Sequence, residues 1–278
     1  MDPVRHLLLR DRRRWLGALA GLAVDRDGAL TLAAVPGPAG GKAIAVPASY
    51  PYAREISGIA AGPCDALFVS DTAHDRVLVV DGLCSAQAWI EGVSAPRGLA
   101  LAANALLVAA AASARIQHFA LPALEANLAW SSWAQPASLA VDSQGRVVLV
   151  DVAAKRLRRV TGNGSTDGAF DAAVTASGKL LAPLFVGVGR DDCVLVSDGG
   201  ADQVFLFDHL GAYLHALQGP TGWRPGALAV SGTYVYVADA ASGAILAFDE
   251  AGALHGSLPG YRGPVTAMAI NARGDLFV

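Results

Sequence analysis

The chain repeats itself about every forty residues, and this repeat limits the possible folds more than any other feature. A small residue, an aliphatic residue and a second small residue, usually alanine, recur along it: Gly21-Leu22-Ala23, Gly58-Ile59-Ala60, Gly98-Leu99-Ala100, Ser138-Leu139-Ala140, Phe185-Val186-Gly187 as a degenerate copy, Ala227-Leu228-Ala229 and Ala267-Met268-Ala269. The central residues are 37, 40, 40, 47, 42 and 40 positions apart. Short apolar runs bounded by Gly, Ser or Asp follow each copy and predict antiparallel strands. Units of this size are typical of four-stranded blades stacked around an axis, a β-propeller.

A second repeated feature is an Asp at the end of the second predicted strand of a blade. It is found at Asp71, Asp151, Asp198 and Asp239, and five residues later a third strand begins at Arg76, Arg156, Gln203 and Ala244. The unit at Ala110 keeps the spacing but lacks the Asp. Because an Asp side chain accepts backbone N–H bonds in the turn that it opens, we interpret these residues as turn structure and not as a site.

These patterns resemble the NHL-repeat propellers. Pro96-Arg97-Gly98-Leu99-Ala100, the Val-Asp or Ser-Asp ends of second strands, and an Asp followed five residues later by Arg or Gln carry the resemblance, which runs over most of the chain from Gly21 to Val278. The resemblance implies one propeller domain over residues 1–278. It implies little about activity, because the family looks mainly like a set of binding modules and includes only a few enzymes.

The copies of the inner strand predict seven blades, with six as the alternative if residues 21–55 are not a blade. The last blade would end within its second strand, at an apolar and unpaired edge. Either the natural chain continues past Val278, or strands in residues 1–20 complete the blade and close the ring, which is the alternative that we favour. Residues 161–180, rich in Gly, Ser, Thr and Asp, interrupt the repeat and predict an exposed loop insertion.

Composition excludes some classes of function. The formal charge of −3 gives no general attraction to nucleic acid, and no apolar run is long enough to span a bilayer. The start of the chain does not resemble a signal peptide, so we expect a cytoplasmic protein or one exported inside a larger particle. The three cysteines, Cys64, Cys84 and Cys193, are too scattered for a disulfide framework, although Cys64 and Cys84 could pair under oxidation.

The expected ligand-binding face carries the turns between second and third strands and the starts of the inner strands. A lactonase- or lyase-like enzyme would need several His, Asp, Glu or Asn side chains there. The starts instead offer Glu55, Arg97, Ala137, Leu184, Gly226 and Val265. Of the six histidines only His74 belongs to this face, and no pair has a metal-binding spacing. The sequence therefore predicts no catalytic residues, no metal and no cofactor.

Two basic clusters, Arg10-Asp11-Arg12-Arg13-Arg14 and Lys155-Arg156-Leu157-Arg158-Arg159, leave RNA binding as an alternative function. We interpret them first as solvated blade edges, because the net charge is negative and the second cluster divides between two faces of a strand. Nucleic acid is therefore not the expected partner.

Aromatic and basic residues outside the repeat indicate a contact surface. Trp, Tyr and Arg are enriched at the energetic centres of protein interfaces. The candidate partner-binding residues are His74, Arg97, Trp133, Trp223, Arg224 and Tyr261. For the aromatic residues the alternative is a place in the core at the junction between blades.

Three functions follow from these observations. The first is a non-catalytic module that binds a protein partner or acts as a scaffold in a larger assembly; the start of the chain is faintly similar to propellers of phage-tail-like particles. The second is a lactonase- or lyase-like enzyme, and the third is an RNA-binding propeller. The sequence leaves the identity of the partner and the oligomeric state open.

Overall fold

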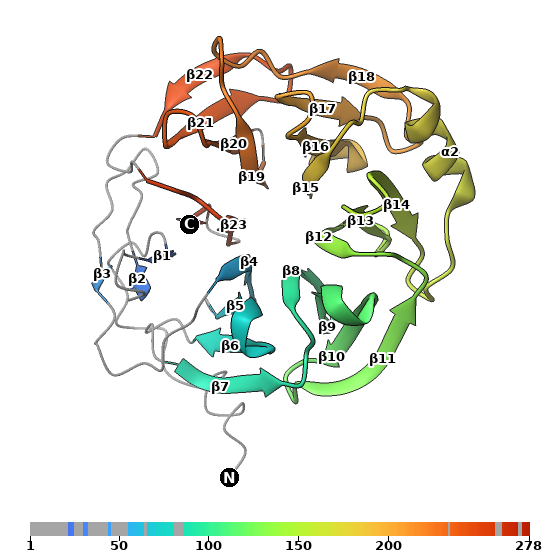
Figure 1. Cartoon of the computed structure of the whole chain (residues 1–278), viewed down its shortest axis with the longest axis vertical. Coiled ribbons are helices and arrows are strands. Elements are labelled where there is room, and N and C mark those ends of the chain that lie inside the picture. Colours follow the sequence, from blue (N-terminus) through green and yellow to red (C-terminus); the bar gives the residue numbers. More distant parts are fainter. Residues whose placement is uncertain are drawn as a thin grey trace.

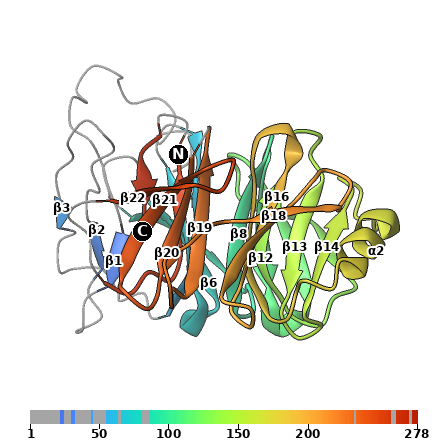
Figure 2. The ribbon, with the colours of Figure 1, turned by 90° about the horizontal axis from the view of Figure 1, so that it is seen from above.

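The chain forms a β-propeller of antiparallel sheets arranged in a circle (Figure 1). In this computed structural model the described residues are 22–24, 30–32, 44–45, 55–63, 66–80, 86–232, 234–258, 263–271 and 274–278. The view from above in Figure 2 shows the blade strands running across the thickness of the ring, with α2 at its outer edge.

Five sheets have the form of a blade, and each follows the chain outward from the axis. Their strands are β4 (Ile56–Ala61), β5 (Leu67–Asp71), β6 (Arg76–Val80) and β7 (Ala86–Glu91); β8 (Pro96–Ala102), β9 (Ala105–Ala110), β10 (Arg115–Ala120) and β11 (Glu125–Ser131); β12 (Pro136–Val141), β13 (Val147–Asp151) and β14 (Arg156–Val160); β15 (Pro183–Val188), β16 (Val194–Asp198), β17 (Gln203–Phe207) and β18 (Tyr213–Ala216); and β19 (Pro225–Ser231), β20 (Tyr234–Asp239), β21 (Ala244–Asp249) and β22 (Leu254–Ser257).

Two smaller sheets lie in the remaining part of the circle (Figure 1). One pairs β23 (Ala269–Ile270) with β24 (Leu276–Phe277), and the other joins β1 (Leu22–Val24), β2 (Leu30–Leu32) and β3 (Ile44–Ala45). The inner strands β4, β8, β12, β15, β19 and β23 contact one another in that order, and β23 also contacts β4. The innermost layer therefore closes on itself.

The predicted propeller is confirmed, but the predicted number of blades is not. The described residues form five blades, four of them four-stranded and one three-stranded, where the sequence predicted seven, or six. The repeat identifies the inner strand at Ala267–Ala269, but its sheet has only two short strands among the described residues. The proposed ring-closing strands in residues 1–20 lie outside the described residues.

Small residues on the inner strands are required because neighbouring blades approach each other closely. A Cβ added at Gly58 would lie 2.0 Å from the backbone oxygen of Arg97, and one at Gly98 would lie 2.5 Å from that of Ala137. At the next junction the hydroxyl of Ser138 accepts a hydrogen bond from the N–H of Val186 at 3.1 Å. At Gly58 and Gly98 the small residue is therefore required by the neighbouring strand, which leaves no room for a side chain.

The predicted exposed loop at residues 161–180 is wrong, because this segment contains a helix that takes the place of a fourth strand. Helix α2 (Gly168–Ala176) packs along β14, with Phe170 at 0% and Val174 at 2% exposure. Its N-cap Asp167 accepts the N–H of Phe170 at 3.2 Å. Both apolar side chains join the core formed with Val148 and Val196. Four residues separate Phe170 from Val174, so one face of the helix is apolar.

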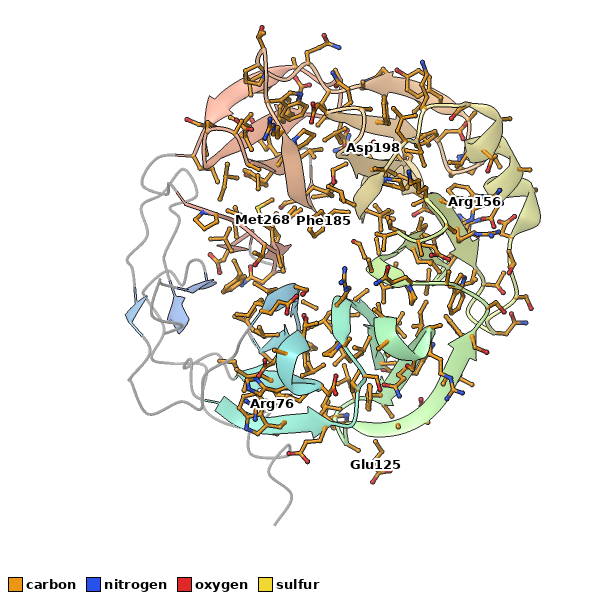
Figure 3. The ribbon with its side chains drawn as sticks, in the orientation of Figure 1. Arg76, Glu125, Arg156, Phe185, Asp198 and Met268 are labelled. Carbon is orange, nitrogen blue, oxygen red and sulfur yellow. The ribbon has the colours of Figure 1, made fainter. Side chains whose placement is uncertain are left out.

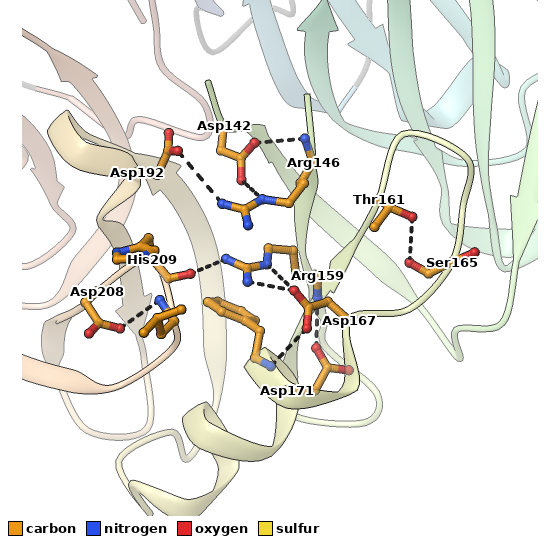
Figure 4. Close-up of polar contacts among 12 residues, drawn as sticks. Asp142, Arg146, Arg159, Thr161, Ser165, Asp167, Asp171, Asp192, Asp208 and His209 are labelled. Atoms are coloured by element: carbon orange, nitrogen blue, oxygen red, sulfur yellow. Dashed lines mark hydrogen bonds and ion pairs between the residues drawn. The ribbon is translucent and has the colours of Figure 1, made fainter. Parts of the chain in front are cut away.

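Arg159 joins this helix to the next blade (Figure 4). Its guanidinium donates to Asp167 at 2.7 and 3.0 Å and to the backbone oxygen of His209, in the loop between β17 and β18. It also lies 4.1 Å from the centre of the Phe170 ring. Arg159 is buried, so its charge is compensated by Asp167.

The apolar core consists of clusters at the junctions between blades. Leu228 and Val237, for example, pack with Leu195 of the preceding blade. Among the described residues, no helix has the length and apolarity that crossing a bilayer requires.

Replacing Phe170 by Ala tests the new position of this segment. Because the ring is fully buried, we expect the free energy of unfolding to fall by about 3–5 kcal/mol, measured by chemical denaturation. Leu210→Ala is the matched control, since Leu210 is 60% exposed and its loss should change stability by about 0.5 kcal/mol or less. Equal effects of the two substitutions would contradict the buried position of Phe170 and support an exposed loop at residues 161–180.

Candidate binding site

One end of the ring carries the turns between second and third strands together with the linkers that lead into the inner strands. In three blades the repeated Asp ties these two segments together. Asp198, labelled in Figure 3, accepts the N–H groups of Leu181 and Ala182 from the linker and those of Gly200 and Ala201 from the turn, at 2.7–3.0 Å. This confirms the structural interpretation of the repeated Asp and shows that it fixes a linker as well as a turn.

Asp151 and Asp239 act in the same way. Asp151 accepts the N–H groups of Ala134 and Gln135 at 2.8 and 3.0 Å, and Asp239 accepts that of Arg224 at 2.8 Å. Burial disfavours the charged form of Asp239, but the N–H of Arg224 and the hydroxyl of Ser242 outweigh it and lower the pKa of this carboxyl.

Asp71 also accepts hydrogen bonds from two side chains of its own turn. The side chain of Asp71 is fully buried and accepts Nδ1 of His74 at 2.8 Å and Nε of Arg76 at 2.9 Å. Because a carboxylate can only accept, Nδ1 of His74 carries the hydrogen, and Nε2 is an acceptor in the neutral ring. The His74 side chain is 40% exposed, so a buried carboxylate holds it at the surface.

Arg76, unlike His74, is not available to a ligand. Its guanidinium lies 3.6 Å from the centre of the Trp89 ring and pairs with Asp71. Two contacts therefore hold it against blade β4–β7.

The turn that carries His74 is bonded to the segment that leads into Arg97. The hydroxyl of Thr72 donates to the backbone oxygen of Pro96 at 2.6 Å, and Asp75 accepts the N–H of Ala95 at 2.7 Å. Ser57 lies 2.7 Å from the hydroxyl of Thr72. The fold thus brings together His74 and Arg97, two of the residues that the sequence singled out.

Arg97 differs from the residues at the start of the other inner strands. The corresponding residues, two positions before the central residue of each repeat, are Ser57, Ala137, Leu184, Gly226 and Thr266, all neutral. Arg97 is half-buried, its Nε is buried without a hydrogen-bond partner, and no carboxylate in the described part of the chain pairs with it. Among the residues at the same repeat position, Arg97 alone is charged, and its guanidinium has no described partner.

The two candidate tryptophans, Trp133 and Trp223, are buried, as the alternative of a core position required. Trp133 is 8% and Trp223 is 4% exposed; Trp223 packs 5.4 Å from the Phe248 ring. Val93 precedes β8 at the distance at which Trp133 precedes β12, and it is also buried. Comparing Trp133 with Val93, the apolar residue at the same place in another linker, would have indicated a core position for Trp133. Arg224 is exposed on the linker before β19, and Tyr261 lies outside the described residues.

Two exposed leucines on this face were missed as a pair. Leu181 is 54% and Leu184 is 37% exposed, on the linker to β15 and at its start. They lie over Gly200 and Gly199, respectively. One indication of this pair was visible in the sequence, the apolar residue at the start of the inner strand, Leu184. Leu181 gave none, because a leucine in a linker is ordinarily buried.

The described residues contain no group of three or more His, Cys, Asp and Glu side chains that could hold a metal ion. His118 lies apart on β10, 4.0 Å from the Trp130 ring, and burial lowers its pKa. Burial also raises the pKa of the Cys193 thiol. Cys64 and Cys84, whose pairing was left open, lie outside the described residues.

The basic cluster at Lys155–Arg159 divides as expected. Arg158 pairs with Asp171 at 3.0 Å and Arg159 with Asp167 at 2.7 Å, whereas Lys155 and Arg156 are exposed without a described partner. The first cluster lies outside the described residues, so a shared face of the two clusters is not shown.

No family model and no curated protein sequence matches the chain. Solved structures do. A streptogramin B lyase is 12% identical, with a TM-score of 0.65 over 94% of this chain and 89% of that one. A catalytically inactive His-to-Ala variant of virginiamycin B lyase from Staphylococcus aureus with quinupristin is 11% identical, with a TM-score of 0.62 over 90% and 87%. Hydrazine synthase of Kuenenia stuttgartiensis is 11% identical, with a TM-score of 0.57 over 82% and 94%. These similarities confirm the propeller fold, whereas membership of the NHL-repeat family is not shown.

Asp239→Asn tests the role of the repeated Asp. The folded-state pKa of Asp239 is lowered, so its stabilisation is present above the unfolded-state pKa and is lost as pH falls through the folded-state value. We expect the variant to be less stable than the wild type by about 1–3 kcal/mol near pH 7, with a smaller difference near pH 3. Chemical denaturation at both pH values measures this. Asp202→Asn, in the exposed turn of the preceding blade, is the control, and a difference that does not depend on pH would contradict the account.

Proposed function

We propose that this chain is a non-catalytic propeller that binds a protein partner on the face that carries His74 and Arg97. An acidic side chain of the partner meets Arg97, and an apolar side chain meets Leu181 and Leu184. Such a module suits a scaffold within a larger assembly, of which a phage-tail-like particle is one example.

The uncompensated charge of Arg97 is the observation that carries this proposal. A guanidinium presents several N–H donors in a fixed plane and binds carboxylates through two parallel hydrogen bonds. The Nε of Arg97 is buried and without a partner, and an unmade hydrogen bond at a buried donor is costly. A partner carboxylate that binds the part of the guanidinium that is not buried would compensate the charge.

The surroundings of Arg97 favour binding over catalysis. The starts of the other inner strands carry one acid, the exposed Glu55 just before β4, and no base, whereas general acid–base catalysis needs such groups within hydrogen-bonding distance of the reacting atoms. Arg is instead enriched at the energetic centres of protein interfaces, and Leu181 and Leu184 expose apolar surface on the same face.

Arg97→Gln tests this site. Peptides would be selected by display against the whole chain, and the dissociation constant of a selected peptide would be measured with the wild type and the variant. We expect a selected peptide to contain Asp or Glu and its affinity to fall about tenfold or more, since a charged hydrogen-bonding partner is removed. Leu184→Asp should weaken binding as well.

The control for this experiment is Arg190→Gln, which removes an exposed arginine from the hairpin between β15 and β16 at the opposite end of the ring. Unchanged affinity is expected for this control. Equal loss with both variants, or selected peptides without acidic residues, would refute the assignment of this site.

A lyase-like enzyme is the second candidate, favoured by the contact between Asp71 and His74. A carboxylate that binds one ring nitrogen of a histidine fixes its orientation, which is the arrangement of a general base. Two of the similar structures are lyases, although a sequence identity of 11–12% supports a shared fold and not a shared activity. If the purified chain consumes quinupristin and His74→Ala stops this, the enzyme proposal replaces the binding proposal. RNA binding has less support, because Arg158 and Arg159 are paired with carboxylates.

A further inference from the structure

The end of the ring opposite to the candidate binding site carries an excess of carboxylates. The turns between first and second strands and between third and fourth strands lie at this end. In blades β12–β14, β15–β18 and β19–β22 the charged residues described there, histidines aside, are Arg146, Arg159 and Arg190 and the carboxylates Asp142, Asp167, Asp191, Asp192, Asp208, Asp249 and Glu250. The three arginines pair with Asp142, Asp167 and Glu250, so the other carboxylates leave this end negatively charged.

Leu210 stands out from this end in the turn between β17 and β18. Its exposed fraction of 60% is the largest among the exposed large apolar residues of the described chain. Asp208 accepts the N–H of Leu210 at 2.9 Å and that of Ala212 at 2.8 Å. Arg159 donates to the backbone oxygen of His209 in the same turn (Figure 4). The turn is therefore held in place, and it presents an ordered apolar side chain to water.

Asp191 lies at the same end of the same blade, in the hairpin between β15 and β16. It is exposed and has no described partner. Burial raises the pKa of the nearby Cys193 thiol, and the negative charges of Asp191, Asp208 and Glu250 raise it further. Asp191, Asp208 and Leu210, which we call the acidic patch, thus combine negative charge with an exposed apolar side chain.

The candidate-site end of this blade has the complementary composition. Leu181 is 54% and Leu184 is 37% exposed, and the exposed Lys179 belongs to the same linker. Lys155 and Arg156 are exposed in the neighbouring turn, and Figure 3 shows Arg156 beside α2, the helix that precedes this linker. These five residues are called the basic patch below.

Few exposed carboxylates offset the basic patch. Asp202 is the exposed carboxylate in the turn of blade β15–β18, whereas Glu55, Asp75 and Glu91 belong to blade β4–β7, in another sector of the ring (Figure 1). The repeated Asp residues at this end are buried and accept backbone N–H groups. The two ends of blade β15–β18 therefore carry exposed charges of opposite sign beside exposed leucines.

We infer that the partner is a second copy of this chain, whose acidic patch docks head to tail on the basic patch of the first. This inference rests on the proposed function, because the acidic patch supplies the acidic and apolar side chains assigned there to the partner. Leu210 lies against the exposed leucines of the basic patch, and Asp208 lies among its Lys and Arg side chains. Asp191, which follows an inner strand, meets Arg97 at the start of another. Since the patches are on opposite ends, each copy keeps one patch free and the contact can extend into a stack.

Sedimentation velocity of the whole chain over about a hundredfold range of concentration tests whether copies associate. At about 0.1 M salt the average sedimentation coefficient should rise with concentration. At about 1 M salt the apparent dissociation constant should rise about tenfold or more, because the Debye length falls from about 10 Å to about 3 Å. A chain that stays monomeric over the whole range at the lower salt would overturn the inference.

Two double variants, each altered at one end, test the head-to-tail geometry. Asp191→Asn with Leu210→Lys removes the acidic patch, and Asn suits the positive φ of 54° at position 191. Lys179→Glu with Leu181→Glu reverses the charge of the basic patch at exposed positions. Each double variant alone should be monomeric. An equimolar mixture should form pairs that do not grow, because each variant keeps the patch that the other lacks.

Glu125→Lys is the matched control for these variants. Glu125 is an exposed carboxylate at the same end of the ring as the acidic patch, but in blade β8–β11, so this variant should associate like the wild type. Chemical denaturation should give wild-type stability for both double variants, since only exposed side chains change. Equal loss of association in Glu125→Lys, self-association of either double variant, or a mixture that stays monomeric would overturn the inference.

Peptide binding separates the failure of this inference from the failure of the proposed function. A monomeric chain that binds acidic peptides through Arg97 would exclude only the second copy as partner. A chain that associates as expected, but whose Arg97→Gln variant binds the selected peptides with wild-type affinity, would refute only the site at Arg97.

Discussion

The close contact between the inner strands of neighbouring blades is the constraint on which the rest of the ring depends. The backbone of Arg97 lies where a Cβ on Gly58 would be, and Ala137 is placed in the same way against Gly98. At the next junction the N–H of Val186 donates a hydrogen bond to the hydroxyl of Ser138. Close packing of this kind permits little adjustment, so it fixes the position of each blade relative to the next. The contact at Gly58 also places Arg97 beside the turn that carries His74.

The second level of organisation is the repeated Asp. By accepting N–H groups from both a turn and a linker, Asp198 and Asp239 hold one face of the ring in a defined shape. One departure from this plan belongs to the site that we propose, because Asp71 also holds His74. Another is blade β12–β14, which has a helix in place of its fourth strand. A scaffold built from regular units can thus carry different surfaces at its irregular positions.

The sequence predicts the regular part of this structure well. The spacing from each repeated Asp correctly located the starts of β6, β14, β17 and β21, because turn geometry is local. The direction of a side chain is not local, so the sequence left a contact surface and the core open for Trp133 and Trp223, and the structure places both in the core. Helix α2 was missed although Asp167 and the spacing of Phe170 and Val174 indicate it, since the surrounding Gly and Ser favour a loop. The pairing of Asp71 with His74 was not foreseen, because the same Asp elsewhere binds backbone groups.

The contact between inner strands can be tested by comparing Gly98→Ala with Gly226→Ala in chemical denaturation. A Cβ at Gly98 would lie 2.5 Å from the backbone oxygen of Ala137, whereas the nearest atom to a Cβ at Gly226 is 3.6 Å away. Both substitutions restrict the unfolded chain equally, so the difference reports the folded state. We predict that Gly98→Ala is less stable than Gly226→Ala by about 1–3 kcal/mol. Equal stability of the two variants would show that the inner strands can move apart without cost, which would contradict the account.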